Sequence, residues 1–184
     1  MKLIVGLGNY PKEYTHTRHN AGFLMVDFLQ QTHEFSSWSE NKKLLCQLSK
    51  GSINGIDCLL AKPQTLMNLS GDSVIKIIQF YKLATNDLLV IHDEIDLPFT
   101  TIKLTQSRNS AGHNGIKSIN SYIKDIYNRI RIGVGRPENK DYDISDYVLS
   151  KFSETELQTL QNDITKQCDK FVTDIILCKN LKVK

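Results

Sequence analysis

The sequence predicts an α/β fold, a single-domain sandwich in which helices flank a central, mixed, twisted sheet. Short apolar runs alternate with amphipathic segments of helical length along the chain, which is typical of strands and helices that intermix around one sheet. A turn sequence between two of these runs predicts a hairpin, so part of the sheet should be antiparallel. The 184 residues suit one core, because a chain of this length buries roughly 70% of its unfolded surface. We expect one domain over residues 1–184.

Hydrophobic spacing and turn residues place the individual elements. The C-terminal helix is the clearest, because Ser153 and Glu156 form a capping-box pattern and apolar residues follow in steps of three and four from Leu157 to Ile175. The expected elements, in chain order, are strand 2–7, helix 21–31, strands 44–49 and 56–61 joined by a turn over 51–55, a helix through Val74–Tyr81, strands 88–92 and 100–105, a helix from about 113 to 123, strand 130–134 and a helix from about 153 to 178.

Charge is distributed unevenly along the chain. The formal net charge is only +3, but residues 101–137 hold seven basic residues and one acid, which gives this segment +6 and leaves −3 for the rest. Such a segment can attract phosphates through counterion release; a solvated surface is the alternative. The basic residues are Lys103, Arg108, Lys117, Lys124, Arg129, Arg131 and Arg136.

Several classes of protein lose support from the sequence. The apolar stretch at the N-terminus has about five residues, too short for a signal peptide or a membrane span, so we expect a cytoplasmic protein without membrane contact. The four cysteines have neither zinc-ligand spacing nor the density of a disulfide scaffold, and we expect them to be reduced core residues. A phosphate-binding loop, Gly-x-Ser-x-Gly and His-Glu-x-x-His are absent. Pro11 stands where a dinucleotide-binding loop would have its third glycine.

Candidate catalytic groups lie where predicted strands end. Asn9, the pair His19-Asn20 and Asp93 are such groups. An imidazole can take a proton from water near neutral pH, and a carboxylate on its other nitrogen fixes the tautomer. The chain has five histidines, and physical reasoning alone does not select the base. Two alternatives stay open: a divalent metal held by Asp93, Glu94 and Asp96, and simple helix N-caps for Asn20, Asn68 and Asn114.

Six blocks of the sequence form a family pattern: Lys2–Asn9 (KLIVGLGN), Glu13–Gly22 (EYTHTRHNAG), Lys62–Gly71 (KPQTLMNLSG), His92–Pro98 (HDEIDLP), Ala111–Gly115 (AGHNG) and Arg131–Pro137 (RIGVGRP). In this order, the six blocks resemble bacterial peptidyl-tRNA hydrolases. A weaker seventh block is Asp146–Phe152, and the last helix is similar only in pattern.

The resemblance implies hydrolysis of the ester between a peptide and the 3′ ribose of tRNA. It assigns His19 as general base, Asp93 as the carboxylate that orients it, and Asn9 as the sensor that favours N-blocked over free aminoacyl substrates. It further implies that Asn68 and Asn114 hold the 3′ end and the peptide backbone. Tyr14 and Leu66 would be neighbouring contacts, and Met67 and His113 would line the cleft.

For the tRNA phosphates, the resemblance points to Lys103 and Arg131. The chain departs from the family pattern nearby, because Thr105 stands where a basic residue is usual and Arg108-Asn109 replace two glycines. Arg108 either restores the lost charge or is simply solvent-exposed. Leu66 stands where an aromatic residue is common, which keeps apolar contact but weakens stacking.

The resemblance implies no metal, no cofactor and no protein partner, and it leads us to expect a monomer. A tRNA- or RNA-binding module of the same fold without turnover remains the alternative from another class of protein. The presence of His19, Asp93 and Asn9 favours the enzyme.

Overall fold

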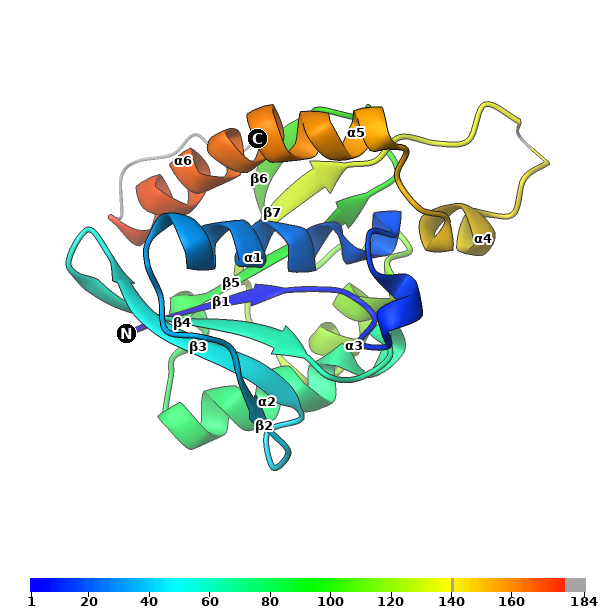
Figure 1. The fold of residues 1–184 in the computed structure, drawn as a ribbon. Coiled ribbons are helices and arrows are strands. Elements are labelled where there is room, and N and C mark those ends of the chain that lie inside the picture. The colour runs from blue at the N-terminus through cyan, green and yellow to red at the C-terminus, as the bar shows by residue number, and fades with distance from the viewer. Residues whose placement is uncertain (140, 178–184) are drawn as a thin grey trace.

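A computed structural model describes residues 1–139 and 141–177. It confirms the predicted fold class: one mixed, twisted sheet of seven strands with helices on both faces (Figure 1). The strand order is β2-β3-β4-β1-β5-β7-β6. The strands are β1 (Lys2–Gly6), β2 (Ser39–Asn41), β3 (Cys46–Ile53), β4 (Ile56–Pro63), β5 (Leu88–Glu94), β6 (Ile102–Gln106) and β7 (Asn128–Gly133).

The centre of the sheet is parallel and its two sides are antiparallel. Strand β1 pairs in parallel with β4 and β5, and β5 pairs in parallel with β7. The pairs β2–β3, β3–β4 and β6–β7 are antiparallel. The carboxyl ends of the parallel strands therefore meet at one edge, where loops of open α/β sheets build binding sites.

Helices cover both faces of the sheet. In Figure 1, α1 lies beside α5 and α6 on one face, and α2 and α3 lie on the other. The helices are α1 (Ala21–Thr32), α2 (Ser70–Tyr81), α3 (Asn114–Tyr122), α4 (Ile144–Leu149), α5 (Glu154–Thr159) and α6 (Thr165–Ile176), with 3₁₀ turns η1 (Lys12–Tyr14), η2 (Arg18–Asn20), η3 (Met67–Leu69) and η4 (Thr85–Asp87).

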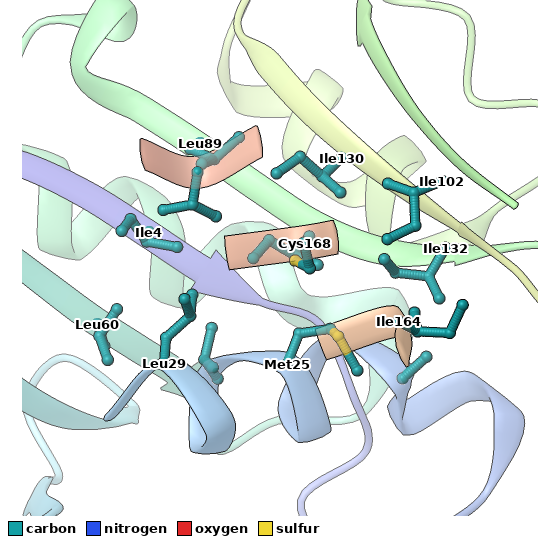
Figure 2. Packing of buried hydrophobic residues seen from close by; sticks show 14 of the residues in the cluster. Ile4, Met25, Leu29, Leu60, Leu89, Ile102, Ile130, Ile132, Ile164 and Cys168 are labelled. Carbon is teal, nitrogen blue, oxygen red and sulfur yellow. The ribbon is translucent and has the colours of Figure 1, made fainter. Parts of the chain in front are cut away.

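Each face has its own apolar core. On the α1 and α6 face, Ile4 and Leu60 of the sheet pack with Met25 and Leu29 of α1 and with Cys168 of α6 (Figure 2). On the other face, sheet residues pack against α2 and α3. The cysteines Cys46, Cys58 and Cys168 are free and buried, as expected, whereas Cys178 lies outside the described residues.

The hairpin was expected correctly, but its turn was not. Strand β3 continues through Gly51 to Ile53, and only Asn54 and Gly55 turn, both with positive φ (49° and 77°). An Asn-Gly pair suits a two-residue hairpin turn because both central residues need positive φ. Gly51 serves packing instead, since a Cβ there would lie 2.5 Å from the ring of Phe35.

The C-terminal helix begins as predicted and is less regular than predicted. The Ser153 hydroxyl accepts from the Glu156 amide, and the Glu156 carboxylate accepts from the Ser153 amide, so the capping box is confirmed. A π-helical segment, η5 (Leu160–Ile164), then separates α5 from α6. Helix α6 is described to Ile176, and the predicted end near residue 178 lies outside the described residues. Within the described ranges, no helix combines the length and apolar character needed to cross a membrane.

Candidate active site

A cavity of about 570 Å³ opens at the carboxyl ends of β1 and β5. Its walls come from loops far apart in the sequence, in keeping with the rule for parallel sheets. Nine of the predicted site residues line it together: Asn9, Tyr14, His19, Leu66, Met67, Asn68, Asp93, His113 and Asn114.

Close packing of helix α1 on the sheet places His19. The residue lies in η2, directly before α1. A Cβ on Gly22 would lie 2.3 Å from the carbonyl oxygen of Ile91, and a Cβ on Gly6 would lie 2.3 Å from the carbonyl oxygen of Gly22. Both positions need glycine because the helix start rests directly on β1 and β5. The chain just before α1 is thereby brought to the end of β5, where Asp93 lies.

Asp93 receives hydrogen bonds from two imidazoles. Nδ1 of His19 lies 2.9 Å from Oδ1 and 3.0 Å from Oδ2 of Asp93, and Nε2 of His113 lies 2.9 Å from Oδ1. The ring centroids of His19 and His113 are 4.9 Å apart. An ionised carboxylate accepts hydrogen bonds only, so each facing nitrogen carries its proton. Nε2 of His19 therefore holds the lone pair that a general base needs.

Helix α3 fixes the tautomer of His113. Its Nδ1 accepts from the backbone N–H groups of Gly115 (3.1 Å) and Ile116 (3.4 Å), which makes His113 the N-cap of α3. A nitrogen that accepts cannot carry a proton, so His113 is neutral and donates from Nε2 to Asp93. Sequence reasoning placed His113 only as a lining residue and missed its bond to the carboxylate.

Burial and charge oppose each other in this cluster. Burial lowers the pKa of His19, but the charge and the hydrogen bond of Asp93 outweigh it and raise the pKa above 6.5. Burial would raise the pKa of Asp93, yet His19 and His113 hold it far below its ordinary value. Asp93 stays ionised at any physiological pH. His19 becomes the neutral base as the pH rises through its raised pKa.

Asn9 is tied to two other loops. Its Oδ1 accepts from the backbone N–H of Met67 at 2.8 Å. Its backbone N–H donates to Oδ1 of Asn20 at 2.8 Å, and Nδ2 of Asn20 donates to its carbonyl oxygen at 3.0 Å. The bond to Met67 sets the amide orientation, so the NH₂ group is the part of Asn9 that can donate to a bound substrate.

The alternative that three asparagines serve as N-caps is wrong for Asn68 and Asn114, whereas Asn20 does stand at the N-cap position of α1. His113, not Asn114, caps α3, and α2 begins after Leu69 without a side-chain cap bond. Asn20 flanks α1, but it too makes no cap bond. Asn68 and Asn114 are instead exposed residues of the cavity wall.

Lys103 and Arg131 lie outside the cavity lining, on the antiparallel pair β6–β7. They stand directly opposite each other in the register, so their side chains share one face. Lys103 is exposed. Nη1 of Arg131 lies 3.5 Å from Oε2 of the buried Glu94, which follows Asp93 in β5.

The basic segment offers fewer free charges than its composition indicated. Arg129 is buried and donates to the carbonyl oxygens of Ser107 (2.7 Å) and Asn109 (2.8 Å), so it supports the loop before α3. Nε of Arg136 bonds Asp96 at 2.8 Å. The +6 charge of the segment therefore overstates the charge that a partner can reach, because the Arg129 guanidinium is bound inside the protein.

Arg108 and Asn109 stand in the loop before α3, where relatives usually have two glycines. The backbone at these two positions does not require glycine. Arg108 and Asn109 are not among the positive-φ residues, whereas Ala111 and Gly112 are. Arg108 is exposed, and its Nη2 lies 3.5 Å from the carbonyl oxygen of Asn120. Thr105 is buried.

The acids of the metal alternative do not form one ligand set. Asp93 binds two histidines, Glu94 accepts from the Asp96 amide and contacts Arg131, and Asp96 faces Arg136. Within the described part of the chain, the cluster that could converge on a metal is His19, Asp93 and His113.

One wall of the cavity was missed altogether. Helix α4 contributes Ile144, Ser145, Val148 and Leu149. Asp143 caps it by accepting from the amides of Ser145 and Asp146. The sequence does contain a signal for this helix, because Asp143 is followed by the apolar residues Ile144 and Val148, four positions apart. The cavity lining also includes residues for which the sequence predicts no substrate contact: Glu94, Ile95, Ala111, Gly112 and Arg136.

The fold and the cavity together define a hydrolytic class of enzyme. The His19 imidazole, oriented by the Asp93 carboxylate and close to side-chain amides, can assist the attack of water as a general base. Comparison with known proteins gives the family. The family model described as Peptidyl-tRNA hydrolase matches residues 3–182. This chain belongs to the peptidyl-tRNA hydrolase family, which confirms the resemblance of the sequence blocks.

Individual relatives agree over nearly the whole chain. The peptidyl-tRNA hydrolase of Rickettsia bellii is 46% identical over 171 residues, 93% of this chain and 91% of that protein. That of Bartonella bacilliformis is 44% identical over 160 residues, 87% of this chain and 81% of that protein. The crystal structure of peptidyl-tRNA hydrolase from Acinetobacter baumannii has a TM-score of 0.88 at 36% identity, covering 97% of this chain and 90% of that one.

Proposed function

We propose that this enzyme hydrolyses the ester between a peptide and the 3′-terminal ribose of tRNA, which recycles tRNA from peptidyl-tRNA. Family membership supports the activity, and the pair His19–Asp93 in the cavity is the observation that carries the mechanism. The substrate is a peptide or another N-blocked aminoacyl group on tRNA.

In the proposed reaction, His19 acts as general base. Nε2 of His19 takes a proton from water while the water oxygen attacks the ester carbonyl, and the imidazolium is stabilised by Asp93. Collapse of the tetrahedral intermediate breaks the bond to the ribose 3′ oxygen, which receives the proton back from His19. Base catalysis of this kind contributes roughly 10² to 10⁴ in rate.

The amides in the cavity have binding roles in this proposal. Asn9 donates to the acyl group next to the scissile ester, and Asn68 and Asn114 hold the 3′ end and the peptide backbone. Tyr14 and Leu66 supply contacts to the same ligand, with Met67 and His113 completing the wall. All of these residues line the same cavity as His19.

Outside the cavity, we propose that Lys103 and Arg131 contact tRNA phosphates. Their shared face on β6–β7 and the exposure of Lys103 support this role. Arg108 is a further candidate, because its exposed guanidinium lies in the loop between β6 and α3.

The setting of the enzyme follows from the substrate. Peptidyl-tRNA arises at ribosomes, so we propose a cytoplasmic enzyme. On the strength of the family resemblance alone, we propose a monomer that works as one domain over residues 1–184 without a partner protein. The proposed steps use protein side chains and water and call for no metal or cofactor.

The test compares N-acylated aminoacyl-tRNA with free aminoacyl-tRNA, each with and without a chelator. We expect the wild-type protein to release the acylated amino acid, to leave the free aminoacyl-tRNA nearly intact and to be indifferent to the chelator. If the acylated substrate survives while still binding, the chain is the RNA-binding module instead. Loss of cleavage with the chelator would indicate a metal-dependent esterase.

A further inference from the structure

The proposed function uses His19 as the base but gives no role to its neighbour Asn20. It is buried in η2, next to the base, and makes no cap bond to α1. Both ends of its amide are used on one residue: Oδ1 accepts from the backbone N–H of Asn9, and Nδ2 donates to the Asn9 carbonyl. This reciprocal pair resembles one rung of a β-ladder made by a side chain.

We call the two hydrogen bonds from the Asn20 side chain to the Asn9 main chain the Asn20 clamp. The position of Asn9 explains why this clamp is needed. Asn9 is buried, yet it lines both the catalytic cavity and a second cavity of about 380 Å³, which Asn20 lines as well. A residue beside two cavities has fewer packing neighbours to fix it than a residue inside a core. Hydrogen bonds have to hold it: Asn20 holds its main chain, and Met67 holds its side chain.

We propose that Asn20 is a positioning residue for substrate selection, because its amide fixes the main chain of Asn9 at a set place relative to His19. The proposal rests on the proposed function, in which Asn9 distinguishes N-acylated from free aminoacyl-tRNA. Since His19 and Asn20 are adjacent in one 3₁₀ turn, the clamp links the base to the sensor. Without it, Asn9 can drift while the pair His19–Asp93 stays in place.

The test measures kcat/KM for N-acylated and for free aminoacyl-tRNA in wild type, Asn9→Ala, Asn20→Ala and the double variant. We expect Asn20→Ala to lower the preference for the acylated substrate at least about tenfold, because two bonds to Asn9 are lost. The double variant should lose no more preference than Asn9→Ala alone, since both changes remove one function. The pH at which kcat/KM rises should stay at its wild-type value.

Gln30→Ala is the matched control. Its side-chain amide also ties main chain, with Nε2 donating to the carbonyl oxygens of Phe35 and Ser36 at 3.2 Å, but it lies outside both cavities. We expect it to keep the wild-type preference. If Asn20→Ala does not fold, Asn20→Asp replaces it; this variant keeps the acceptor for the Asn9 N–H but cannot donate, and a partial loss of preference is expected.

The proposal would be overturned if folded Asn20→Ala or Asn20→Asp kept the wild-type preference for the acylated substrate. It would also be overturned if the loss of preference in the double variant equalled the product of the losses in Asn9→Ala and Asn20→Ala. The proposed function fails in a different way. In that case wild type does not cleave the acylated substrate, or Asn9→Ala leaves its preference unchanged.

Discussion

At the cavity, Asp93 is buried and two imidazoles donate to it at 2.9 Å, whereas on β6–β7 Lys103 is exposed and Arg131 meets its carboxylate partner at 3.5 Å. The first region is preorganised, because hydrogen bonds fix the Asp93 carboxylate and the orientation of the His19 ring before substrate arrives. The second presents long basic side chains with looser contacts, which can reach a polyanion. If β6–β7 contacts tRNA as proposed, chemistry and tRNA binding are separable, and substitutions in the two regions should change different quantities.

The largest effect within this comparison is expected for Asp93→Asn. An amide nitrogen would face the protons of His19 or His113, which favours the wrong His19 tautomer, so kcat should fall roughly 10² to 10⁴-fold. In wild type, kcat/KM should rise with pH through a value above 6.5, because Asp93 raises the pKa of His19. Any residual activity of the variant should rise at a lower pH, as that charge is gone. Asp57→Asn, an exposed change early in β4, is the control.

Arg129→Met should affect stability rather than catalysis. The variant leaves the carbonyl oxygens of Ser107 and Asn109 without their donor, which should cost about 1–3 kcal/mol in the free energy of unfolding. Denaturant unfolding measures this cost. A variant that is fully stable but weak in tRNA binding would show that Arg129 belongs to the binding surface after all.

Arg131→Ala should have the smallest effect. It should weaken binding of whole tRNA by a few-fold and lower the slope of log affinity against log salt by about one, while cleavage of a minimal acylated 3′ fragment stays nearly intact. Lys166 on α6 is also an exposed cation, and Lys166→Ala should change neither the affinity for tRNA nor its salt dependence. Equal losses on whole tRNA and on the fragment would refute the phosphate role of Arg131.

Local signals in the sequence were enough for most of the fold. The Ser153–Glu156 capping box, the alternation of strands and helices and the hairpin are all properties of neighbouring residues. The predicted turn over 51–55 is broader than the observed turn at Asn54-Gly55, because Gly51 makes room for Phe35 and does not turn the chain. The π-helical segment inside the last helix had no recognisable signal.

The site depended on contacts that sequence spacing does not encode. His19 and Asp93 are 74 positions apart, and only the family resemblance singled out His19 among five histidines. The tautomer of His113 depends on its place as the N-cap of α3, a position for which the sequence suggests Asn114 as an alternative. Likewise, nothing in the composition distinguishes the buried Arg129 from Arg131 two residues later.

The most direct test of the proposed chemistry is single-turnover cleavage of N-acylated aminoacyl-tRNA by wild type and His19→Ala, with enzyme varied to saturation so that binding and chemistry separate. We predict that the saturating rate falls roughly 10² to 10⁴-fold in His19→Ala, while the enzyme concentration at half saturation stays close to that of wild type. A His19→Ala variant that cleaves at the wild-type rate once saturated would contradict the assignment of His19 as the base.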